Sequence, residues 1–220
     1  MIFKIEEQAG APPIILASVS PRRIELLARL GFAFETDASG VDELAIPFKS
    51  EREYAMKAAL AKAKEVAGRS RWKGGLVIGA DTIVCLNGEV LGKPRGRDDA
   101  RRMLEMLRGR AHDVITGVAV AVGGTETAAV DSERTRVFFK RFRRGTMEKY
   151  LAGGESLDKA GAYGIQGAGK SLVHHIEGDY FNVVGLPLGL LLRLLGQFIN
   201  IEAHQRELAR LRYPYREELF

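Results

Sequence analysis

Two arginines stand at the start of an expected helix. The apolar, β-branched run 14–17 predicts a strand, and Ser20 and Pro21 then suit the N-cap and first turn of a helix. Arg22 and Arg23 follow where the helix dipole is positive and where a capping box would carry an acidic residue. An anion such as phosphate would make this arrangement favourable, because free amides and guanidinium groups donate to its oxygens. The alternative interpretation is two solvated surface arginines.

A carboxylate follows another apolar run in the middle of the chain. Residues 77–80 predict a buried strand, and Asp81 and Thr82 come directly after them. In an α/β sheet, residues just past the carboxyl end of a strand face the crevice where ligands bind. Asp81 could equally accept hydrogen bonds from loop amides, and Thr82 is also an ordinary strand-forming residue.

Several further segments combine with these two into a family pattern. They are Gly92-Lys93-Pro94, Thr116-Gly117, the run 157–167 and the run 178–188. In this order, the segments closely resemble the Maf family of nucleoside triphosphate pyrophosphatases, from about Ile14 to about Phe198. A phosphate loop alone would be weak support, whereas several independent segments are specific.

The resemblance implies an α/β class of fold, a two-lobed mixed sheet of the Maf/ITPase-like type with helices packed on the sheet. It divides the chain into an N-terminal extension (1–12), a nucleotide pyrophosphatase domain (13–200) and a charged C-terminal tail (201–220). The tail carries Tyr213, Tyr215 and Phe220, and we interpret it as a peripheral helix or frayed end, or as a segment that packs on a second subunit.

Cleavage of a nucleoside triphosphate requires neutralising about four negative charges, holding a metal and activating a water. The resemblance implies that the substrate-binding residues are Ser18, Arg22, Arg23, Thr82 and Gln166. It makes Asp81 the general base, since apolar surroundings favour a proton-accepting carboxylate, with Lys62 and Lys93 as the other catalytic residues. Without the resemblance, Lys62 would be one more solvated lysine on a helix that also holds Lys57 and Lys64.

The expected cofactor is a divalent metal cation, Mg²⁺ or Mn²⁺. The candidate ligands are Glu43, Asp81 and Asp158, and one or two carboxylates suffice because phosphate oxygens and waters complete the shell. Asp42 is the alternative to its neighbour Glu43. The histidines show no metal-ligand spacing and are expected to be structural; they are His112, His174, His175 and His204.

Base specificity can be argued from Gln166. The edge of uracil or thymine presents acceptor, donor and acceptor, and a glutamine amide offers a donor beside an acceptor. In the family, an Arg, a Thr and a Gln mark the branch that acts on dTTP and UTP, and Arg22, Thr82 and Gln166 match them. We therefore expect hydrolysis of dTTP and UTP, and of modified pyrimidine triphosphates, with release of pyrophosphate. The alternatives are a 7-methyl-GTP pyrophosphatase, a non-catalytic nucleotide-binding regulator of septum formation and, for Gln166, a loop amide bonded to backbone.

Composition places limits on partners and compartment. The 220 residues are 46% hydrophobic and 28% charged, which is typical of a globular protein. A net charge of +5 and the basic cluster between Arg134 and Arg144 invite nucleic acid, but the alternation over Arg134–Lys140 fits a strand with one wet face. Specific nucleic-acid binding is therefore not expected. The single cysteine, Cys85, is interpreted as a small buried hydrophobe in a reducing compartment. We find neither a signal peptide nor a membrane span and expect a cytoplasmic protein, which the resemblance suggests is a homodimer.

The remaining elements follow from local signals. Ser50 and Glu53 predict a capped helix that ends at Gly68, and Asn87-Gly88 predicts a hairpin. The other expectations are strands at 32–35, 114–122 and 127–139, the last two in an antiparallel lobe, and helices at 22–30, 97–108, 148–151 and 187–199.

Overall fold

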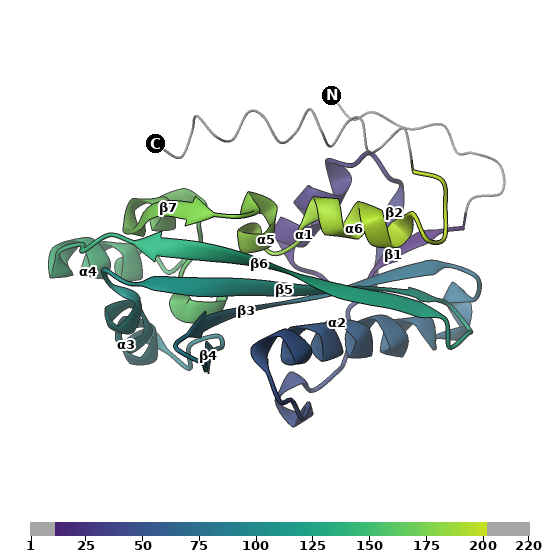
Figure 1. The fold of residues 1–220 in the computed structure, drawn as a ribbon, viewed down its shortest axis with the longest axis horizontal. Coiled ribbons are helices and arrows are strands. Elements are labelled where there is room, and N and C mark those ends of the chain that lie inside the picture. The colour runs from purple at the N-terminus through teal and green to yellow at the C-terminus, as the bar shows by residue number, and fades with distance from the viewer. Residues whose placement is uncertain (1–11, 202–220) are drawn as a thin grey trace.

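A computed structural model describes residues 12–201 of the chain. These residues form one seven-stranded mixed sheet in the order β2-β1-β3-β5-β6-β7, with β4 paired to β3 (Figure 1). Strand β1 is parallel to β2 and β3, and every other pairing is antiparallel. The strands are β1 (Ile14–Leu16), β2 (Phe34–Thr36), β3 (Leu76–Leu86), β4 (Glu89–Leu91), β5 (Ala111–Val122), β6 (Ala128–Phe139) and β7 (Val173–Glu177). The predicted mixed sheet is confirmed, and its antiparallel part continues the parallel part.

Helices cover both faces of the sheet (Figure 1). Helix α2 packs on one face through its alanines, against residues such as Val77 and Ala119. The larger core lies on the other face, where α1 and α3 to α6 pack on residues such as Ile78 and Val118. The helices are α1 (Pro21–Ala28), α2 (Glu51–Ala67), α3 (Arg97–Leu107), α4 (Arg144–Ala152), α5 (Tyr180–Val184) and α6 (Leu188–Leu195). Within residues 12–201, no helix is long and apolar enough to cross a membrane.

Helix α2 packs unusually close to strands β3 and β5, because each strand has a glycine where the helix crosses it. A Cβ on Gly79 would lie 2.2 Å from the carbonyl oxygen of Ala59, and one on Gly117 would lie 2.1 Å from that of Ala55. No side chain fits in this space, so the α2 backbone rests directly on the sheet. The helix begins as predicted, with the Ser50 hydroxyl accepting from the Glu53 amide at 3.2 Å, and it ends at Gly68.

The strand register leaves a gap beside the middle of β3. Strand β1 pairs with β3 only as far as Ile78, and β4 begins to pair at Val84. Residues 79–83 therefore have a strand neighbour on the β5 side alone. The gap lies at the carboxyl end of β1, where ligands bind in parallel α/β sheets.

Most local predictions are confirmed, with shifts at element ends. One was wrong: β3 continues to Leu86, so Asp81 and Thr82 lie within the strand instead of just past its carboxyl end. The Asn87-Gly88 hairpin forms, with both φ angles positive at 52° and 86°. Helix α4 begins four residues earlier than predicted, and α6 is shorter because Gly196 ends it. Cys85 is buried in β3, and burial raises the pKa of its thiol to about 12. The tail aromatics and the N-terminal extension up to residue 11 lie outside the described residues.

Candidate active site

Asp81 and Thr82 project to opposite faces of β3, because neighbouring side chains of a strand alternate. Asp81 shares its face with Ile83 and Cys85, beneath α2, whereas Thr82 shares its face with Ala80 and Val84, beneath α1 and α5. Both residues stand in the gap between β1 and β4. The gap therefore lets groups from the two faces meet at one edge of β3.

On the α2 face, a lysine bridges two carboxylates. The Lys62 Nζ atom lies 2.7 Å from Asp81 Oδ1 and 2.6 Å from Glu43 Oε1. Lys62 is 8% exposed and Asp81 5%, so this is a largely buried ion group. Glu43 comes from a 3-10 turn, η1 (Glu43–Ala45), and is half-buried. The structure thus brings together three residues that the resemblance selected, and it places Lys62 in the interior instead of on the solvated face.

Charges from both faces act on Glu43. Burial opposes its ionisation, but the hydrogen bond and charge of Lys62 outweigh that effect, with help from Lys93 and Arg23, and hold the pKa of Glu43 below its ordinary value. Conversely, burial lowers the pKa of Arg23, against the raising influence of Asp81 and Glu43. Glu43 is therefore ionised at neutral pH, and the cations and carboxylates form one interacting group.

Arg23 is held by two groups on the opposite face. Its Nε donates to the carbonyl of Gly185 at 3.0 Å, and its Nη2 donates to Thr82 Oγ1 at 3.2 Å. Pro21 occupies the first turn of α1 as predicted, whereas the Ser20 side chain makes no capping hydrogen bond. The Ser18 hydroxyl instead accepts from the Ser20 amide at 3.2 Å.

Arg22 is tied to the loop that follows α4. Its Nη1 lies 2.9 Å from Asp158 Oδ2, and Lys159 Nζ lies 2.6 Å from the other oxygen of the same carboxylate. Burial disfavours the charged form of Asp158, but the hydrogen bonds from Lys159 and Arg22 prevail and lower its pKa. Asp158 is exposed, and its charged contacts in this structure are with Arg22 and Lys159.

Gln166 and Lys93 stand apart from these contacts. Gln166 is half-buried and precedes a 3-10 turn, η4 (Gly167–Leu172), without capping it by a side-chain hydrogen bond. Lys93 is exposed after the hairpin and acts on Glu43 through its charge. Their expected roles in the reaction stay predictions.

The donor set at the site suits a hard cation of the Mg²⁺ class. Glu43 and Asp81 each bond Lys62 through one oxygen, which leaves the second oxygen of each carboxylate for a metal. Within residues 12–201, no three His, Cys, Asp or Glu side chains are grouped to form a cage of their own. A metal at this position would therefore depend on the phosphate oxygens of a ligand, and Asp158 as third ligand stays a prediction.

The histidines that the structure describes contact other protein side chains. His112 is 3% exposed, its Nε2 lies 2.6 Å from the Tyr163 hydroxyl, and burial lowers its pKa to about 3. His174 and His175 contact each other on β7. His204 lies outside the described residues.

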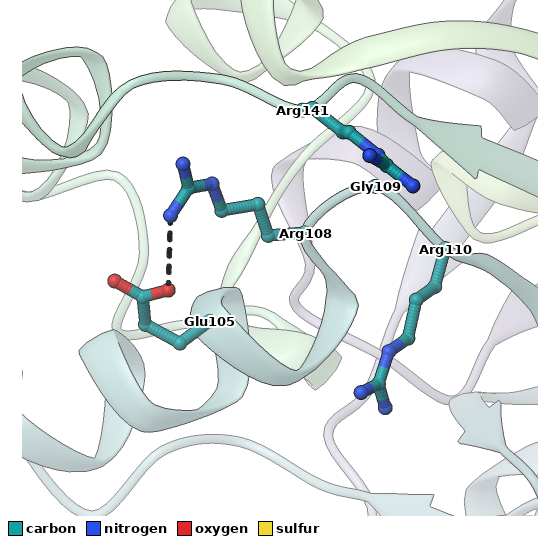
Figure 2. A pocket seen from close by; sticks show the side chains of 5 residues that line it. All are labelled: Glu105, Arg108, Gly109, Arg110 and Arg141. Carbon is teal, nitrogen blue, oxygen red and sulfur yellow. Dashed lines mark ion pairs between the residues drawn. The ribbon is translucent and has the colours of Figure 1, made fainter.

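A separate hollow of about 400 Å³ lies at the far end of β5, beside the end of α3 (Figure 2). Its lining residues are Glu105, Arg108, Gly109, Arg110 and Arg141. Arg108 points toward Glu105, and their charged groups are 3.6 Å apart (Figure 2). The hollow is about 20 Å along β5 from Gly117, the partner of Asp81, so it is not part of the site.

Three residues complete the site that the sequence analysis did not select. Thr116 and Asn182 are fully buried and connect Thr82 to α5, and Gly185 supplies the carbonyl that holds Arg23. All three fall in segments that carry the family resemblance. Their residue types alone gave no signal, because a buried hydroxyl or a backbone carbonyl becomes informative only when its partner is known.

The structure is that of an α/β protein in which a cation-rich helix start and a lysine between two carboxylates lie beside the same strand of a mixed sheet. Residues 13–198 match the family described as Maf-like protein, and the chain belongs to that family.

Relatives cover most of the chain. It is 50% identical over 185 residues to a protein of Moorella thermoacetica named dTTP/UTP pyrophosphatase, covering 84% of this chain and 94% of the relative. It is 48% identical over 185 residues to a protein of that name from Symbiobacterium thermophilum, covering 84% and 93%. Among solved structures, a nucleoside-triphosphatase / dITP/XTP pyrophosphatase from Mycobacterium abscessus aligns at 14% identity with a TM-score of 0.43, covering 86% of this chain and 98% of that one.

Proposed function

We propose that this protein is a nucleoside triphosphate pyrophosphatase that hydrolyses dTTP and UTP to the nucleoside monophosphate and pyrophosphate. The observation that carries the proposal is the buried group of Glu43, Lys62 and Asp81 beside the arginine-bearing start of α1. The names of relatives at 48% and 50% identity support the substrate class. The same names give no support to a 7-methyl-GTP pyrophosphatase or a non-catalytic regulator.

The phosphate chain would bind at the start of α1. Arg23 uses Nε and Nη2 for the protein, and its Nη1 group can donate to phosphate oxygens. Arg22 and Lys93 add positive charge, and the first-turn amides of α1 add donors. These groups neutralise the charge that limits attack on a polyphosphate.

Asp81 would act as the general base. Water adds to the α-phosphorus while its proton passes to Asp81, and the bond from this phosphorus to the bridging oxygen breaks to release pyrophosphate. Lys62, at 2.7 Å, fixes the carboxylate and compensates its charge when no substrate is present. A divalent metal held by Glu43 and Asp81 would further neutralise the phosphates.

Gln166 would select the base by pairing with the imide edge of uracil or thymine. Modified pyrimidine triphosphates that keep this edge would also be substrates. We also propose that the protein works in the cytoplasm as a homodimer, in line with the family resemblance; light scattering after gel filtration would report the mass in solution.

Product analysis tests the reaction type. Incubation with dTTP and Mg²⁺ or Mn²⁺ should yield dTMP and pyrophosphate in equal amounts. Release of orthophosphate with dTDP would contradict cleavage between the α- and β-phosphates. Saturable dTTP binding without turnover would indicate a nucleotide-binding regulator instead.

A further inference from the structure

We propose that Thr82 and Thr116 are positioning residues that hold Arg23 toward the phosphates, and that Thr82 does not read the base. The inference rests on the proposed function and deepens it. It concerns a chain of hydroxyl groups that runs inward from Arg23 across β3 and β5 to helix α5.

The direction of this chain follows from counting protons. Arg23 Nη2 lies 3.2 Å from Thr82 Oγ1, and a guanidinium can only donate, so Thr82 accepts. Thr116 Oγ1 lies 3.0 Å from the backbone carbonyl oxygen of Asn182. A carbonyl oxygen can only accept, so the Thr116 hydroxyl donates its single proton to it. The two hydroxyl oxygens are 3.0 Å apart, and Thr82 must therefore donate to Thr116.

Because of this direction, the Thr82 hydroxyl has no proton left to donate to a nucleotide base. Its one proton points at Thr116. Among the residues that the structure describes, the other acceptor near it is the Gly185 carbonyl, at the longer distance of 3.5 Å. One of its lone pairs already receives the Arg23 hydrogen bond. Without Thr116, the Thr82 hydroxyl would be free to rotate, and its lone pairs would no longer be held in a fixed direction toward Arg23.

The inner end of the chain is anchored firmly. Asn182 is fully buried, and its Nδ2 donates to the Val114 carbonyl at 3.0 Å and to Thr135 Oγ1 at 2.9 Å. Its backbone N–H also donates to Asp179 Oδ1, the N-cap of α5, at 2.8 Å. Helix α5 is thereby fixed on β5 and β6, and it leads directly into Gly185, which accepts from Arg23 Nε.

Both contacts of Arg23 thus depend on one framework. Gly185 has a φ of 125°, which suits glycine, and a Cβ there would lie 3.5 Å from Thr82 Oγ1 and 3.9 Å from Arg23 Nε. The framework presents a guanidinium with two of its donors occupied and its Nη1 group remaining for an anion. Loss of one hydroxyl should weaken anion binding by about 3- to 10-fold, the size of one hydrogen bond.

The test uses Thr116→Val and Thr82→Val in the full chain, with the Ser variants as conservative replacements. Thr127→Val is the matched control, because Thr127 is exposed in the β5–β6 turn. Calorimetry gives the Kd for pyrophosphate, and kinetics give kcat/KM for UTP and CTP. Thermal melting confirms that each variant is folded.

Both Val variants should raise the pyrophosphate Kd about 3- to 10-fold, while the UTP to CTP ratio of kcat/KM stays within about twofold of the wild type. Thr116→Ser and Thr82→Ser should restore binding, and Thr116→Val should add little in an Arg23→Lys background. A purely structural role would not produce this coupling to Arg23.

Three results would overturn the inference. They are an unchanged pyrophosphate Kd with an altered UTP to CTP ratio, effects of Thr116→Val and Arg23→Lys that simply add, and no measurable pyrophosphate binding by the wild type. Because pyrophosphate binding does not depend on which nucleotide is cleaved, this readout decides the inference even if neither dTTP nor UTP is a substrate.

Discussion

Asp81 combines burial with a single close cation. Its Oδ1 bonds Lys62 at 2.7 Å, and the same ammonium bonds Glu43, so one positive charge faces two carboxylates. Glu43 is half-buried and shares this lysine with the buried Asp81. Lys62 contacts Asp81 through Oδ1, so in the proposed reaction the second carboxylate oxygen is the one that would take the proton of the attacking water.

We expect Asp81→Asn to lower kcat for dTTP hydrolysis by roughly 10²-fold or more while nucleotide binding is largely kept, because an amide cannot take the proton. Steady-state kinetics and calorimetric binding of dTTP would measure the two effects separately. Asp98→Asn, at the exposed start of α3, is the matched control. Turnover near that of the wild type would remove Asp81 from the role of base.

A second buried carboxylate has a structural role. Asp37 receives hydrogen bonds from Trp72 Nε1, Arg71 and Arg69, and these lower its pKa from 3.8 to about 2, with the Trp72 bond the largest cause. A depressed folded pKa stabilises the protein above pH 4, and this contribution is lost as the pH falls from about 4 toward 2.

Asp37→Asn should therefore lower the Tm at pH 7 and flatten the fall of Tm between pH 5 and pH 2. Melting curves across that range would check both statements. An unchanged acid slope in the variant would show that Asp37 does not contribute to acid unfolding.

For individual residues, the sequence alone does not predict which side chains of a motif are buried or what they contact. The spacing around Lys62 is that of a solvated helix, and the family resemblance alone singled it out. Its burial results from α2 lying on two glycines of distant strands, which no local pattern encodes. Thr116 and Asn182 were missed for the same reason, since they contact each other although they lie 66 residues apart in the sequence.

At the scale of elements, α2 is the part that sets the geometry of the site. Its alanines pack on β3 and β5, and its close seat on Gly79 and Gly117 brings Lys62 to Asp81. The ends of this helix could be predicted from its capping residues. Its distance from the sheet could not, because that distance depends on glycines in two distant strands.

Gly79→Ala should displace α2, because the new Cβ would lie 2.2 Å from the Ala59 carbonyl oxygen. We expect a loss of roughly 1–3 kcal/mol in the free energy of unfolding, together with a fall in kcat. Chemical denaturation and steady-state kinetics would measure these. Gly145→Ala is the control, since a Cβ there has no neighbour within 4 Å. Equal free energies of unfolding for the two variants would contradict the direct packing of the α2 backbone on Gly79.

Strand and helix boundaries show a related limit. The hairpin at Asn87-Gly88 and the long strands β5 and β6 were predictable from turn residues and alternation. Their joining into one sheet with β1 and β3 was not, because strand order depends on pairings between distant segments. The gap beside residues 79–83 follows from that order.

In the whole molecule, one mixed sheet brings charged side chains from both of its faces together at the gap beside residues 79–83 of β3. Residues 13–198 carry the family match, and the site falls within them. The arginines around the hollow in Figure 2, Arg108, Arg110 and Arg141, lie outside this site.

The proposed preference for dTTP and UTP is tested by the initial rate of pyrophosphate release from dTTP, UTP, CTP and 7-methyl-GTP, measured with Mg²⁺ or Mn²⁺ for the wild type and for Gln166→Ala. The wild type should cleave dTTP and UTP much faster than CTP, whose edge exchanges donor and acceptor. Gln166→Ala should reduce that preference by about 1–3 kcal/mol, mainly by slowing the good substrates. Equal rates on CTP and UTP, or a preference for 7-methyl-GTP, would contradict the account.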